Sequence, residues 1–353
     1  MTRGPEIVVC VGPGGVGKTT TSAALALRAA QAGRRACVVT IDPARRLADA
    51  LGTTGVGNEP HLVGAPEGQQ WAGELWAVML DAQGTFDHLV ERYANSPEQE
   101  AAIKANPVYR NISAALSGTQ EYMAVEKLYE LQESGAYDYI VIDTPPAQHA
   151  LDFMEAPRHL TRLLDNRVFR LLMTPTRMGL RALEVGAQLM LRTIAKVAGG
   201  QVVSDTVQFF TEFEGMEDGF RARAQRADEM LHSDQTSFVL VCAPRRDTVE
   251  EAVFLADHLS REGLQPAEIV VNRCYPHFGA VPEALAEALS STELAPLVAN
   301  LNQLRAVAER EDAQLERLSN AVPKAVLRRV PLISPAVSDI PGLVEVARSL
   351  VDQ

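Results

Sequence analysis

The chain has 353 residues, a formal net charge of −12 and a hydrophobic fraction of 46%. That length is enough for one large or two smaller globular domains, and the composition is typical of an α/β protein. The negative charge disfavours a surface that binds nucleic-acid phosphates or anionic lipid, so we expect no nucleic-acid partner. No run approaches the roughly 20 apolar residues of a membrane span, so we expect no integral membrane segment.

The first predicted elements are a strand at residues 7–11, a glycine-rich loop and a helix at residues 20–32. Residues 12–19 read Gly-Pro-Gly-Gly-Val-Gly-Lys-Thr and match the Walker A pattern G-x-x-x-x-G-K-[ST]. In such a loop, backbone N–H groups and the helix start surround a polyphosphate, while Lys18 reaches the β- and γ-phosphates and the Thr19 hydroxyl binds Mg²⁺. The expected nucleotide contacts are Gly14, Gly15, Val16, Gly17, Lys18, Thr19 and Thr20.

A second predicted strand, at residues 36–41, ends at Asp42 and precedes a helix at residues 45–51. An aspartate at this end of a strand, beside a phosphate loop, lies where α/β sheets bind ligands. It can orient or deprotonate the water that attacks a γ-phosphate, or it can simply cap the next helix. The pattern alone favours neither interpretation.

A second predicted strand that ends at an aspartate lies in the middle of the chain. Residues 52–73 read as a loop, followed by a strand at 75–80 and helices at 81–94 and 119–133. A buried strand at residues 137–142 then ends at Asp143. This is the Walker B arrangement, in which the carboxylate holds Mg²⁺, usually through water.

Strand patterns are absent from residues 151–233. Apolar residues recur there at helical spacing, namely Leu180, Leu183, Ala187, Met190, Ile194 and Val197, and are followed by Phe209, Phe210, Phe213, Met216 and Phe220. Because roughly 80 residues exceed an ordinary crossover, we expect an inserted helical subdomain at 151–235, with helices from about 81–134 contributing. Its apolar surface can bind an apolar partner, or it can pack against other helices or a second subunit.

Strands and helices alternate again to the end of the chain. Strands are predicted at 238–242, 268–271 and 328–333, and helices at 248–260, at 281–320 and after Pro341. The pattern predicts a doubly wound, mainly parallel α/β sheet in a single P-loop domain over residues 1–353. The strand that starts at residue 7 leaves no room for a secretory signal, and four widely spaced cysteines in or beside strands are typical of buried thiols, so we expect a cytoplasmic protein.

Five stretches together resemble one family, the ArsA-like ATPases of the deviant Walker A class. The family includes the arsenite-pump ATPase and the ATPase that delivers tail-anchored membrane proteins. The stretches are residues 12–20, 40–51 (Thr-Ile-Asp-Pro-Ala-Arg-Arg-Leu-Ala-Asp-Ala-Leu), 117–121 (Ser-Gly-Thr-Gln-Glu), 143–149 (Asp-Thr-Pro-Pro-Ala-Gln-His) and 270–273 (Val-Val-Asn-Arg). The resemblance covers nearly the whole chain and is to a bacterial-type member.

The resemblance implies roles for individual residues. Asp42 matches the hydrolytic aspartate of the first switch, and Asp143 matches the magnesium-side aspartate of the second. Asn272 matches the residue that reads the adenine ring, and the segment at Pro331 matches a loop that covers the base. ATP and Mg²⁺ are therefore the expected ligands, with Asp42 and Lys18 as the catalytic residues.

The sequence departs from the family pattern at two places that matter. Pro13 stands where the deviant Walker A loop carries a signature lysine that reaches the partner's nucleotide, and proline has neither charge nor N–H. The zinc-binding C-x-x-C is also missing, because Cys274 is followed by Tyr275, Pro276 and His277. We therefore expect no zinc, and we do not expect arsenite transport, since the cysteines are confined to the predicted sheet.

These features favour a dimeric Mg-ATP-dependent switch that hydrolyses ATP and handles a client, a hydrophobic protein segment, through its helical subdomain. The dimer can be a homodimer or a heterodimer with a related subunit. A first alternative is a weakly hydrolysing regulatory subunit whose paralogue carries the signature lysine. A second is a ParA- or MinD-like partitioning ATPase, although no basic patch supports it.

Overall fold

The computed structural model describes residues 4–42, 46–66, 68, 70–110, 118–166, 200–289, 292–333, 337 and 339–350. It divides into two compact units. Unit 1 comprises Met1–Met79, Gly135–Ala150 and Asp234–Gln353, and unit 2 comprises Leu80–Ser134 and Leu151–Ser233. The apolar stripe expected between Leu180 and Val197 lies outside the described residues.

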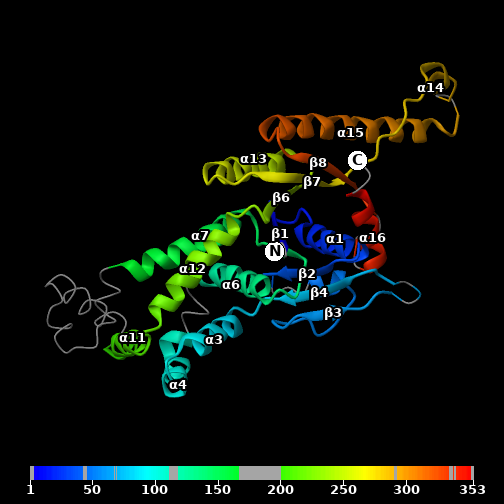
Figure 1. The fold of residues 1–353 in the computed structure, drawn as a ribbon. Helices are drawn as coiled ribbons and strands as arrows, with labels where there is room; N and C mark the ends of the chain where they lie inside the picture. Colours follow the sequence, from blue (N-terminus) through cyan, green and yellow to red (C-terminus); the bar gives the residue numbers. More distant parts are fainter. Residues whose placement is uncertain are drawn as a thin grey trace. The chain divides into compact units, whose positions relative to one another are not determined.

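Unit 1 is built on a sheet whose described strands follow the order β3-β4-β2-β5-β1-β6-β7-β8 (Figure 1). The strands are β1 (Glu6–Val11), β2 (Arg35–Thr40), β3 (His61–Val63), β4 (Glu74–Met79), β5 (Tyr139–Asp143), β6 (Thr236–Cys242), β7 (Pro266–Cys274) and β8 (Val326–Pro331). Only the short β3 pairs antiparallel among these strands. The predicted α/β fold with a mainly parallel sheet is confirmed.

Helices flank this sheet in unit 1. They are α1 (Lys18–Gln31), α2 (Arg46–Ala50), α13 (Arg246–Arg261), α14 (Glu283–Leu289), α15 (Ala295–Ala321) and α16 (Ile340–Ser349). The Ala- and Leu-rich α1 packs closely against α16, and both contribute to one buried cluster with the side chains of β1 and β2. This cluster fixes the helix that follows the phosphate loop.

The sheet register determines where the polar strand ends meet. Strand β5 lies between β1 and β2, and Cys10 and Thr40 are both register partners of Asp143. Because these strands are parallel, the residues that follow them emerge at the same edge of the sheet. The phosphate loop and the two acidic strand ends are therefore neighbours.

Unit 2 is helical in the part that the structure describes. Its helices are α3 (Ala82–Tyr93), α4 (Pro97–Ala105), α6 (Thr119–Ser134), α11 (Gly200–Glu212), α12 (Glu217–Leu231) and most of α7 (Ala147–Asp165), which begins in unit 1. Its core is rich in aromatic rings, including Phe86, Tyr109 and Phe220. Among the described residues, no helix of either unit is long and apolar enough to cross a membrane.

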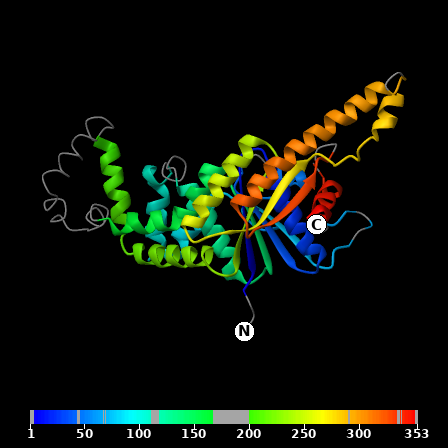
Figure 2. The same cartoon turned by 90° about the horizontal axis from the view of Figure 1, so that it is seen from above.

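Two details differ from the sequence expectation. The helical stretch predicted at 281–320 is divided into α14 and α15, and Pro296 lies in the first turn of α15, where proline favours the start of a helix. Helix α14 buries none of its residues, and it extends with the beginning of α15 beyond the strands of unit 1 (Figure 2). The expected loop at 52–73 contains the strand β3.

Candidate nucleotide-binding site

The phosphate loop joins β1 to α1 and depends on glycine. Gly17 caps α1 with a φ of 94°, and a Cβ built on it would lie 2.2 Å from Nδ2 of Asn272. A Cβ on Gly12 would lie 2.0 Å from the carbonyl oxygen of Val241. Larger residues at either position would collide with the neighbouring strand ends, so the close packing of the loop explains these two glycines of the motif.

Lys18 is buried and points back into the loop. Its Nζ donates to the carbonyl oxygens of Gly12 at 3.0 Å and Pro13 at 2.8 Å. Burial lowers the pKa of Lys18, while the nearby Asp143 carboxylate opposes that shift. The loop carbonyls thus hold a cation at the position from which lysine would reach a phosphate. Pro13 contributes a carbonyl to this arrangement and no charge.

Asp143 lies beside the loop and is almost fully buried. Its Oδ2 accepts hydrogen bonds from the hydroxyls of Thr19 at 2.6 Å and Thr40 at 2.9 Å. Burial raises the pKa of Asp143 to about 6, although both hydrogen bonds favour the ionised form. The structure therefore brings together the two residues that the sequence predicts as Mg²⁺ ligands.

The donor set suits a magnesium ion. Oδ1 of Asp143 is buried and accepts no hydrogen bond within the described residues. A buried carboxylate oxygen without a donor is costly, whereas a hydrated Mg²⁺ would satisfy it. The Thr19 hydroxyl offers a second hard oxygen at the same place. The residues present thus fit the cation that the motif implies.

Asp42 follows β2 and is about 29% exposed. Its backbone N–H donates to the hydroxyl of Thr40 at 3.2 Å, and its Oδ2 lies 3.5 Å from Nη1 of Arg46. Asp42 is thereby linked through Thr40 to Asp143 at the edge of the sheet where the phosphate loop emerges. The remaining residues of this predicted switch, 43–45, lie outside the described part of the chain.

The residues expected near the base lie towards the ends of the neighbouring strands β7 and β8. Asn272 is buried, and its Nδ2 donates to the carbonyl oxygen of Val16 at 2.9 Å. Pro331 is the register partner of Cys274, two residues after Asn272. Both residues therefore lie on adjacent strand ends, and Asn272 touches the phosphate loop directly.

Sequence reasoning assigned no role to three side chains at this site. Thr40 donates to Asp143, Arg46 pairs with Asp42, and Nη1 of Arg273 donates to the carbonyl oxygen of Gly15 at 3.4 Å. A polar residue ending an otherwise buried strand was a usable signal for Thr40. The two arginines are exposed, and charged side chains at exposed positions carry no such signal.

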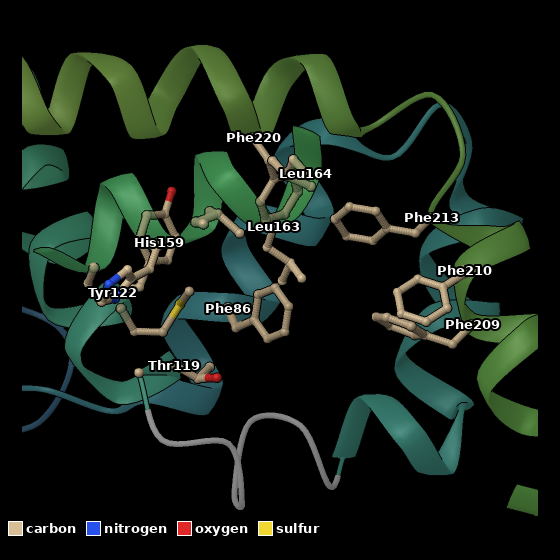
Figure 3. Close-up of a pocket in the computed structure, with 14 residues that line it drawn as sticks. Phe86, Thr119, Tyr122, His159, Leu163, Leu164, Phe209, Phe210, Phe213 and Phe220 are labelled. Carbon is tan, nitrogen blue, oxygen red and sulfur yellow. The ribbon is translucent and has the colours of Figure 1, made fainter. Parts of the chain in front are cut away.

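Unit 2 contains a separate feature, an apolar cavity of about 670 Å³ (Figure 3). Helices α3, α6, α7, α11 and α12 contribute to its wall, and the labelled side chains include Phe86, Leu163, Phe209 and Phe213. Phe209 and Phe213 are buried, whereas Leu163 is 51% exposed. Part of the apolar bulk noted in the sequence therefore lines a cavity large enough for a ligand.

The comparisons with known proteins agree with this geometry. The family described as "Anion-transporting ATPase" (ArsA_ATPase) matches residues 5–352. The chain belongs to this ATPase family. The ArsA-like family and the ATPase activity expected from the sequence are confirmed.

Curated relatives of this ArsA-type ATPase include three fungal proteins, each named ATPase GET3. The Malassezia globosa protein is 28% identical over 275 residues, which cover 77% of this chain and 74% of the relative. The Aspergillus terreus protein is 26% identical over 74% of this chain and 71% of its own length. The Sclerotinia sclerotiorum protein is 28% identical over 74% of this chain and 70% of its own length.

Proposed function

We propose that this ArsA-type ATPase is a Mg-ATP-dependent molecular switch. The observation that carries the proposal is the group of Thr19, Thr40 and Asp143, in which a buried carboxylate keeps one oxygen without a donor beside a phosphate loop. Mg²⁺ bound there would neutralise phosphate charge and hold the nucleotide in place.

Each predicted site residue then has a distinct task. Lys18 exchanges the carbonyls of Gly12 and Pro13 for the β- and γ-phosphates, and the loop N–H groups of residues 14–20 bind the polyphosphate. Asp42 orients or deprotonates the attacking water. Asn272 and Pro331 contact the adenine base.

We also propose that the whole chain acts as one ATPase domain with an inserted helical subdomain, which takes up a hydrophobic protein segment. The apolar cavity of unit 2 supports this idea because its wall is built almost entirely of aromatic and aliphatic side chains. Such a surface suits an apolar helix rather than a polar metabolite. We also propose that the protein is cytoplasmic and that it binds no zinc.

A fluorescent peptide of about 20 apolar residues tests the client proposal. Leu163→Asp places a charge on the cavity wall at a side chain that is already 51% exposed, and Leu62→Asp is the matched control at 50% exposure in β3 of unit 1. We expect Leu163→Asp to weaken peptide binding about tenfold or more and Leu62→Asp to leave it unchanged. Equal binding by both variants would rule the cavity out as the client site.

A second candidate function is a regulatory subunit of a heteromer, and Pro13 is the observation that favours it. Without the signature lysine, this chain supplies no cation from that position to a partner's nucleotide. Sedimentation with Mg-ATP, Mg-ADP or no nucleotide gives the oligomeric state, and ATP binding and turnover are measured on the same protein. Together these measurements separate the two candidates. A homodimer that forms with ATP supports the self-sufficient switch, whereas a monomer that binds ATP without turnover supports the heteromer.

A further inference from the structure

Arg273 has an unusual backbone conformation for an exposed arginine. Its φ is 64°, and within the described residues it is the one non-glycine residue with a positive φ. It lies at the end of β7, where the pairing with β8 shifts register between Val271 and Cys274. A side chain in the left-handed region costs conformational energy, and such residues gather at functional sites.

Two consecutive side chains fasten this strand end to the phosphate loop. Nδ2 of Asn272 donates to the carbonyl oxygen of Val16, and Nη1 of Arg273 donates to that of Gly15. The left-handed turn at Arg273 lets both side chains reach the same loop, which alternation along a regular strand would prevent. The strained backbone is thus explained by where it directs the guanidinium group.

The guanidinium lies on the carbonyl side of the loop. The cation assigned to the phosphates is Lys18, which binds the carbonyls of Gly12 and Pro13. Arg273 binds a different carbonyl, that of Gly15. It forms no ion pair with any carboxylate in the part of the chain that the structure describes. The group next to it is the amide of Asn272, which is proposed to contact the edge of the adenine ring.

We propose that Arg273 is a purine-stacking residue, whose planar guanidinium and stem cover one face of the adenine base while Nη1 holds Gly15. This inference rests on the proposed ATP site, and it adds a contact between Arg273 and one face of the adenine ring. Arginine suits the task because its flat, weakly hydrated cation stacks on aromatic rings.

Calorimetric binding of ATP and of inorganic tripolyphosphate tests the proposal, because only ATP carries a base. Arg273→Gly removes the side chain and suits a φ of 64°, so the variant should fold. Arg273→Lys keeps the charge without the plane. Arg261→Ala, in α13, removes an exposed arginine paired with Asp257 and is the control.

We expect Arg273→Gly to weaken ATP binding about 3- to 30-fold, Arg273→Lys to weaken it less, and neither variant to change tripolyphosphate binding. Arg261→Ala should match the wild type with both probes. Equal losses for ATP and tripolyphosphate would assign Arg273 to the phosphates and overturn the proposal, as would unchanged ATP binding. Failure of the wild type to bind ATP would instead refute the nucleotide site itself.

Discussion

At the residue scale, neighbouring groups form hydrogen bonds with the buried charged side chains of the phosphate-loop region. Lys18 binds two loop carbonyls, and Asp143 accepts two hydroxyl donors. These contacts limit the cost of burying a cation and a carboxylate. In the proposed mode of nucleotide binding, Lys18 exchanges these carbonyls for phosphate oxygens.

Gly17→Ala should destabilise the protein by about 1–3 kcal/mol and abolish ATP binding, because Ala is strained at a φ of 94° and its Cβ would displace Asn272. Gly55→Ala is the control, since Gly55 has a φ of 90° and no atom within 4 Å of a built Cβ. We expect it to lose stability through strain alone and to bind ATP normally. Urea unfolding and calorimetry measure the two effects, and intact ATP binding by Gly17→Ala would contradict the account.

The pKa of Asp143 gives a pH prediction for the protein without nucleotide or Mg²⁺. Because burial raises this pKa to about 6, from 3.8 in a model peptide, the folded state binds the proton more tightly than the unfolded state. Asp143 therefore destabilises the fold above pH 6, and the penalty is relieved as the pH falls from about 6 towards 4.

Between pH 7.5 and 5.5, the wild type should gain about 1 kcal/mol of unfolding free energy relative to Asp143→Asn. Comparing the two proteins cancels the titration of the other groups. Urea unfolding at both pH values provides the measurement. A difference that does not change with pH would mean that Asp143 titrates normally in the folded protein.

At the element scale, sequence patterns located the strands well and the helices less completely. Apolar β-branched runs such as residues 7–11 and 137–142 have few alternatives to a buried strand. The three-residue β3 and the division of 281–320 depended on local pairing and on Pro296, and neither produces a periodic pattern. At the site, motif residues were found from their spacing, whereas Arg273 and Arg46 are positioned by tertiary structure alone.

The contact between α6 and α12 in unit 2 provides an element-scale prediction. Arg223 and Glu126 form an ion pair, and each side chain is only 3% exposed. Arg223→Ala leaves a buried carboxylate without its partner and should cost about 3–5 kcal/mol, whereas adding Glu126→Leu should recover much of the loss. Thermal and urea unfolding followed by circular dichroism measure both.

Arg246→Ala is the control for that experiment, because Arg246 pairs with Glu250 on the surface, where the side chains are 78% and 49% exposed. Its expected cost is below about 1 kcal/mol. If Arg223→Ala proved as mild as this control, the buried pair would not be important for the packing of unit 2.

At the scale of the whole molecule, unit 1 contains the phosphate loop and the proposed Mg²⁺ site, and unit 2 contains an apolar cavity. The family match over residues 5–352 establishes the ATPase. In the proposed function, this ATPase is a switch whose nucleotide state controls the binding of an apolar client.

The most direct test of the account is Mg²⁺-dependent ATP turnover by the purified chain, measured beside Asp42→Asn with the ATP affinity of both proteins determined in the same buffer. Asp42 is partly exposed and its substitution removes one surface ion pair, so the variant should fold. We predict turnover that falls about 100-fold or more in the variant, while ATP affinity stays within a few-fold. Equal turnover by the two proteins, with ATP bound by both, would contradict the assignment of Asp42 as the hydrolytic residue.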